Sequence, residues 1–140
     1  MFKLTAIING ILIAVMISFN GLLAKQLGNN IALIVIHILG VFTTSIIFIF
    51  SRYKYNTIKG LPIYLFIGGA IGIFNISLNN MTINKLGVAL TIGLCLLGQL
   101  GTSMIIDHYG LFGVNVSKIN IKKLTGILIM SIGIVVMITI

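Results

Sequence analysis

Residues 26–51 read QLGNNIALIVIHILGVFTTSIIFIFS, a run without a single Asp, Glu, Lys or Arg. A helix needs roughly 20 apolar residues to cross the hydrocarbon core of a bilayer, so this run is about one span. A composition of 59% hydrophobic and 7% charged residues lies outside the range of soluble domains. The sequence therefore predicts an all-α integral membrane protein with a single transmembrane domain over residues 1–140. The other uncharged runs of similar length are 4–24, 60–84, 86–106 and 124–140.

Short polar connections separate the five expected transmembrane helices. Gly28 follows the first helix as a stop signal, and Pro62 lies at the start of the third, where its missing N–H costs nothing. Residues 79–85 are expected to form a tight polar turn, and residues 107–121 the longest loop. The expected helices cover about 4–24, 31–50, 61–79, 86–106 and 122–140.

Positive charge is distributed unequally between the two sides of the predicted membrane. With five spans, the N-terminus and the loops after the second and fourth helices share one side. Short loops rich in Lys and Arg stay in the cytoplasm, so we expect a cytoplasmic N-terminus and an outside C-terminus. Because the charges are scattered at helix ends, the net charge of +8 indicates contact with anionic lipid headgroups and not nucleic acid. The richer side carries Lys3, Arg52, Lys54, Lys59, Lys118, Lys122 and Lys123, and the other carries Lys25 and Lys85.

Small residues and buried polar groups hold helices together in lipid, and four of the five helices carry stripes of them. In the first helix Ala6, Gly10, Ala14 and Ser18 recur every four residues. In the third, Gly68, Gly72, Asn75 and Asn79 share one face, and in the fourth Thr91, Cys95, Gly98, Gln99 and Thr102 do so. In the fifth, Gly126 and Gly133 are accompanied by few polar residues, which indicates a packing element more than a pathway.

Polar residues at membrane depth are costly and often functional, which singles out Asn20, His37, Asn75 and Gln99. They either form interhelical hydrogen bonds or line a binding site. Both interpretations stay open for Asn20 and Asn75, whereas small residues on the faces of His37 and Gln99 favour a site there. On the face of His37 these are Gly40 and Thr44. Asp107, the only acidic residue, is a candidate gate or coupling group, although its place at a helix end favours anchoring of the loop.

Patterns for catalysis are missing from the sequence. It has no His, Cys, Asp or Glu residues with metal-ligand spacing, no paired carboxylates and no convergent Ser–His–Asp set. Its Gly-x-x-Gly runs lie in apolar helix and not after a strand, which excludes a phosphate-binding loop. We therefore expect no enzyme activity, no cofactor and no metal, which leaves the movement or binding of a substrate.

The region from Gly68 to about Ile134 resembles a known family. The residues that carry the resemblance are GGAIG at 68–72, LGVALT at 86–91, QL at 99–100 and DHYG at 107–110, followed by a helix with two spaced glycines. This pattern is similar to the YdcZ-like family of the drug/metabolite transporter superfamily. The first two helices match it in general pattern only, with Asn20 and the Gly40 region as shared points.

The resemblance implies a five-helix chain of a bacterial inner membrane that works in antiparallel pairs. Such pairs are homodimers of dual orientation, two oppositely oriented partners, or one fused chain. Because the seven-to-two charge bias should insert this chain one way, a heterodimer with an oppositely oriented paralogue is favoured, with a homodimer as the alternative. Related small multidrug exporters use a glutamate in the first helix. This chain has no carboxylate inside any span, which argues against proton-coupled export of lipophilic cations. A neutral or zwitterionic substrate is equally compatible with the sequence.

The leading hypothesis is thus half of an inverted-repeat secondary transporter that works by alternating access on a small molecule. Asn20, His37, Asn75 and Gln99 would line its midplane cavity, and replacement of Gln99 by Leu would abolish binding or transport. Two alternatives are a structural or accessory membrane protein without transport activity, and a flippase subunit for a lipid-linked substrate.

Overall fold

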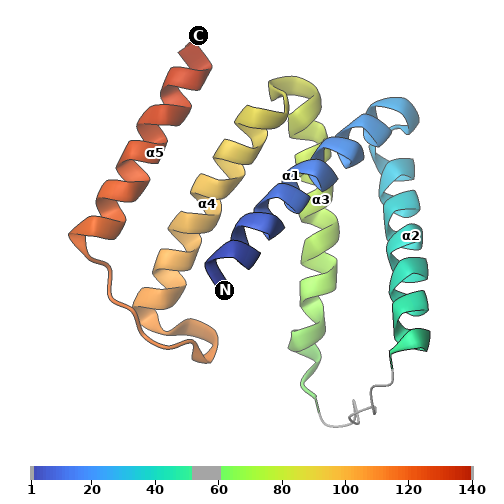
Figure 1. Cartoon of the computed structure of the whole chain (residues 1–140), viewed down its shortest axis with the longest axis horizontal. Helices are drawn as coiled ribbons and strands as arrows, with labels where there is room; N and C mark the ends of the chain where they lie inside the picture. The colour runs from blue at the N-terminus through green and yellow to red at the C-terminus, as the bar shows by residue number, and fades with distance from the viewer. Residues whose placement is uncertain (1, 52–60, 140) are drawn as a thin grey trace. The chain divides into compact units, whose positions relative to one another are not determined.

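The computed structural model of the protein describes residues 2–51 and 61–139. Within these ranges every regular element is a helix, and five helices are long and apolar enough to cross a membrane (Figure 1). The all-α class and the five predicted spans are therefore confirmed. The long helices are α1 (Phe2–Leu27), α2 (Asn29–Phe50), α3 (Ile67–Leu86), α4 (Val88–Tyr109) and α5 (Ile121–Thr139), and the short 3₁₀ helices are η1 (Ile63–Phe66) and η2 (Leu111–Gly113).

The chain divides into two compact units, Met1–Lys85 and Leu86–Ile140. The first unit contains α1, α2, η1 and α3, and the second contains α4, η2 and α5. The expected single transmembrane domain over residues 1–140 stays a prediction. The polar loop with Arg52, Lys54 and Lys59 lies outside the described residues.

In the first unit, one glycine makes the turn between α1 and α2. Gly28 has φ 82° and ψ 154°, a region that is accessible essentially to glycine alone. Its N–H donates to the carbonyl of Ala24 (2.9 Å) and its carbonyl accepts from Ala32 N–H (3.1 Å), so both helices stay hydrogen-bonded up to the turn. The stop signal expected from Gly28 is therefore a turn of one residue.

A second glycine allows α1 to approach α3. A Cβ atom built on Gly21 would lie 2.7 Å from Cγ2 of Ile83, well inside van der Waals contact. Gly21 itself is buried. The contact between α1 and α3 therefore depends on the missing side chain at this position, in the way that small residues bring helices together in membranes.

The third helix begins and ends later than predicted: the expected span was 61–79, whereas a 3₁₀ helix occupies Ile63–Phe66 and α3 covers Ile67–Leu86. Residues 79–85 were expected to form a polar turn, but α3 continues through them to Leu86. The physical reason is that Asn79 and Asn80 are buried, 7% and 0% exposed, where their amides serve packing between helices and not a solvated turn. Pro62 caps the preceding 3₁₀ helix, η1, close to the expected start.

In the second unit, α4 packs against α5 where a Cβ on Gly93 would meet Cγ1 of Ile134 at 3.5 Å. The predicted loop begins only at Gly110, since α4 runs on to Tyr109, and Gly110 closes it in the left-handed conformation. Asn120 caps α5 because its Oδ1 accepts the backbone N–H of Lys123 at 2.9 Å.

Candidate functional site

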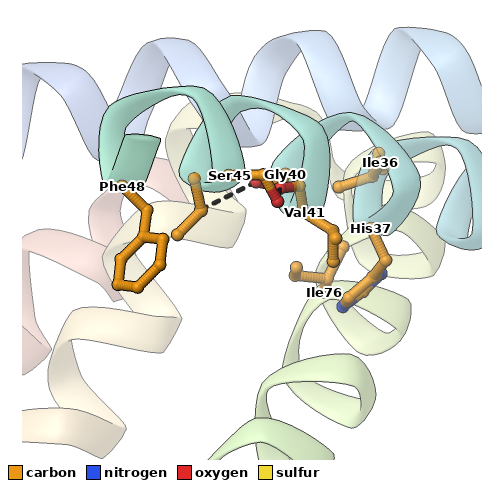
Figure 2. A pocket seen from close by; sticks show the side chains of 8 residues that line it. Ile36, His37, Gly40, Val41, Ser45, Phe48 and Ile76 are labelled. Atoms are coloured by element: carbon orange, nitrogen blue, oxygen red, sulfur yellow. Dashed lines mark hydrogen bonds between the residues drawn. The ribbon is translucent and has the colours of Figure 1, made fainter. Parts of the chain in front are cut away.

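A groove with a volume of about 520 Å³ opens on the first unit between α2 and α3. Its size is typical of sites for small molecules. All described lining residues except Ile76 of α3 belong to α2, where helical spacing places them on one face. Figure 2 shows His37 near one end of this groove and Phe48 at the other. The lining residues are Ile36, His37, Gly40, Val41, Thr44, Ser45, Phe48 and Ile76.

The groove lies at membrane depth. α2 begins at Asn29, so His37 is about 12 Å along the helix axis from that end and Thr44 about 22 Å, at 1.5 Å per residue. A hydrocarbon core about 30 Å thick therefore has its midplane between these two residues. The face of His37, Gly40 and Thr44, which the sequence singled out, is the face that lines the groove.

Each polar side chain among the described lining residues is hydrogen-bonded to its own helix. The Thr44 hydroxyl donates to the Gly40 carbonyl and the Ser45 hydroxyl to the Val41 carbonyl, both at 2.8 Å. Nδ1 of His37 lies 2.7 Å from the carbonyl of Leu33. These bonds satisfy the protons of the groove's polar groups without a second helix, so they do not hold the bundle together.

Asn20 borders a different hollow, of about 530 Å³, between α1 and α2. Gln26 also lines it, and Ile36 is shared with the His37 groove. Asn75 is exposed and lines neither hollow, although the next residue, Ile76, forms the α3 wall of the groove. Of the four predicted cavity residues, three thus belong to the first unit, and two of these border neighbouring hollows.

The fourth predicted cavity residue, Gln99, and the candidate gate, Asp107, belong to the second unit. Gln99 is an exposed residue of α4. Asp107 lies in the last turn of the same helix, where its carboxylate is 4.0 Å from Nζ of Lys123 and its carbonyl accepts from Ser117 N–H at 2.8 Å. The Lys123 ammonium also donates to the Ser117 hydroxyl at 2.9 Å. These contacts support the loop-anchoring interpretation of Asp107, and its role as a gate or coupling group stays a prediction.

Sequence reasoning missed a polar network that joins the start of α2 to the end of α3. Nδ2 of Asn29 donates to the Ser77 hydroxyl at 2.7 Å, and Nδ2 of Asn80 donates to Oδ1 of Asn29 at 3.2 Å. Nδ2 of Asn84 donates to the Asn80 carbonyl at 3.0 Å. The density of Asn residues at 79–84 was the available signal, but it was interpreted as a turn.

The residues of the groove are suited to binding a ligand rather than to catalysing a reaction. None of its described lining residues is Asp, Glu, Lys or Arg. Among residues 2–51 and 61–139, no group of three or more His, Cys, Asp or Glu side chains could hold a metal ion. A groove of apolar walls with a few polar groups at mid-membrane depth suits the reversible binding of a small molecule.

Five helices long and apolar enough to cross a bilayer define a multi-pass membrane protein. Residues 1–136 match the family described as "Putative inner membrane exporter, YdcZ". The chain belongs to this family and is a multi-pass protein of the inner membrane. The match confirms the resemblance seen in the sequence and extends it over the first two helices. No curated protein and no solved structure matches the chain.

Proposed function

We propose that the chain is one subunit of a secondary transporter that exports a small molecule by alternating access. The observation that carries this proposal is the His37 groove, because it combines apolar walls with polar groups near the membrane midplane. Membership of an exporter family supports movement of the bound molecule and not its chemical conversion. Asn20, Asn75 and Gln99 would approach the same substrate path in the assembled transporter.

The working unit would be an antiparallel pair, which completes the substrate cavity by adding an inverted second subunit. An inverted pair gives a five-helix chain the two-fold symmetry on which alternating access depends. Small-residue faces support such a pair: a Cβ on Gly10, Gly68 or Gly126 would have no atom within 4 Å. Faces of this kind are where helices of separate subunits approach closely in lipid.

The charge distribution favours an oppositely oriented paralogue as the partner, with a homodimer as the alternative. In this arrangement the N-terminus is cytoplasmic and the C-terminus outside. Tags at both termini, tested for sidedness in intact cells, would check the orientation. We expect one dominant orientation, and equal amounts of both would contradict the proposed heterodimer and favour the dual-orientation homodimer.

Cysteine accessibility tests the groove itself. In a Cys95→Ser background, a membrane-impermeant maleimide added to cells or to inverted vesicles should label His37→Cys, because a substrate path is filled with water from one side at a time. Ile38→Cys is the matched control: it lies at the same depth and is 62% exposed in the structure, but it does not line the groove and should face lipid.

The results separate transport from the alternatives. Labelling at position 37 with none at 38 supports a substrate path. No labelling at 37 from either side would indicate a packed bundle, and hence a structural or accessory protein. The same probe at positions 75 and 99 tests whether Asn75 and Gln99 share the path.

A further inference from the structure

The polar atoms of the His37 groove present hydrogen-bond acceptors and no free donors. The hydroxyl protons of Thr44 and Ser45 are directed at the carbonyls of Gly40 and Val41. A hydroxyl oxygen that donates its proton in this way still has lone pairs with which to accept. Both oxygens are therefore acceptors toward anything that enters the groove.

In its neutral form, His37 has the same property. A carbonyl oxygen can only accept, so the 2.7 Å contact with Leu33 places the proton of the neutral ring on Nδ1. Nε2 then carries a lone pair and is the acceptor that remains for a ligand. Breaking any of these bonds would leave a hydroxyl or ring N–H proton without an acceptor in an apolar environment, which is costly in lipid.

Among the residues that the structure describes, no Asp, Glu, Lys or Arg lines the groove. Its other described lining residues are aliphatic, aromatic or glycine. An anion would face lone pairs without a donor or a positive charge. A quaternary cation has no N–H group to donate and would meet no carboxylate. Phe48 offers one aromatic face, which compensates only weakly for the loss of water around a cation.

We infer that the groove takes an uncharged, largely apolar molecule that carries a hydroxyl or N–H group. This inference rests on the proposed function and names the substrate class of the same site. The apolar body would contact Val41, Phe48 and Ile76, and the donor would bond to Thr44 and Ser45 or to His37. Because Thr44 lies seven residues beyond His37, about 10.5 Å along the helix, a single donor would use one end only.

The experiment compares two probes that differ only in the donor. Equilibrium binding of 4-hexylphenol and of its methyl ether, 4-hexylanisole, is measured on the full chain in lipid nanodiscs, with empty nanodiscs to subtract partitioning. One hydrogen bond predicts that the phenol binds about fivefold more tightly. Tetraphenylphosphonium and 4-hexylbenzoate, the charged comparisons, should bind more weakly than the phenol.

Two variants locate the effect on the groove. Thr44→Val removes an acceptor from the groove, while Thr43→Val removes the neighbouring hydroxyl, which donates to Leu39 outside it. We expect the preference for the phenol to fall in Thr44→Val or in His37→Phe and to persist in Thr43→Val. Equal binding of phenol and ether by the unaltered chain, or a preference for either ion, would overturn the inference whether or not the variants fold.

Failure of the inference is distinguishable from failure of the proposed function. A water-accessible His37→Cys with no discrimination between phenol and ether would leave the transporter proposal standing and refute the substrate class. Donor-dependent binding with no maleimide access at position 37 would support the substrate class and refute the transporter proposal.

Discussion

Replacing Gly21 with alanine should destabilise the first unit through one identifiable contact. The added methyl would lie 2.7 Å from Cγ2, 3.2 Å from Cδ1 and 3.3 Å from Cβ of Ile83. Carbon atoms pack best at about 3.5–4.0 Å, so the overlap with Cγ2 is about 1 Å. A rotation of the Ile83 side chain cannot remove all of it, because Cβ is fixed to the backbone. Overpacking of this kind costs about 1–3 kcal/mol.

Gly10→Ala on the same helix is the matched control. A Cβ there would have no atom within 4 Å, so the variant gains the helix propensity of alanine without a clash. Gly21→Ala gains the same propensity, which means that the difference between the two variants isolates the overlap. We expect Gly21→Ala to be less stable than Gly10→Ala by about 1–3 kcal/mol.

The assay is unfolding of the purified full chain in mixed micelles, followed by circular dichroism as the fraction of dodecyl sulfate rises. Ile83→Ala removes Cγ2 and Cδ1 and should relieve the clash. The double variant should therefore be more stable than the sum of the two single effects by about 1 kcal/mol or more. Equal stability of Gly21→Ala and Gly10→Ala, or strict additivity in the double variant, would refute the proposed close approach of α1 and α3.

Two further predictions concern the ends of the helices in the same unit. Gly28→Ala should cost about 1–3 kcal/mol in the same unfolding assay, because φ 82° and ψ 154° are strained for any side chain although no atom lies within 4 Å of the new methyl. Gly68→Ala is its control. Equal unfolding midpoints for Gly28→Ala and Gly68→Ala would show that the turn relaxes to accept a side chain. Asn80→Ala should lose about 0.6–1.7 kcal/mol by breaking the bond to Asn29, whereas the exposed Asn75→Ala should lose less. A larger loss for Asn75→Ala would contradict the network.

The spans were predictable because hydrocarbon thickness and the absence of charge fix them almost without regard to tertiary structure. The groove face was partly predictable: a polar His37 with Gly40 and Thr44 at helical spacing already marks one side of α2. The partner wall at Ile76 was not, since an isoleucine in an apolar helix carries no signal of what it faces. The same limit applies to Gly21, which belongs to none of the small-residue stripes and yet lets α1 approach Ile83 of α3 closely.

Asn29 and Asn80 show why the end of α3 was mispredicted. A cluster of asparagines beside Lys85 has the composition of a turn, and local propensity alone favours that interpretation. Whether asparagine ends a helix or extends it depends on a partner far away in the sequence. Here the partner is the first residue of α2, and the bond between the two amides converts residues that favour turns into buried contacts within a helix.

The structure also changes the meaning of the two basic residues on the side predicted to be outside. Lys25 lies in the last turn of α1 and Lys85 in the last turn of α3, where a positive charge interacts favourably with the helix dipole. Each therefore has a local reason to be present that is independent of topology. The seven basic residues of the other side then stand as the topological signal, opposed only by two charges that also stabilise helix ends. This strengthens the proposal that the chain inserts one way and that its inverted partner is a separate chain.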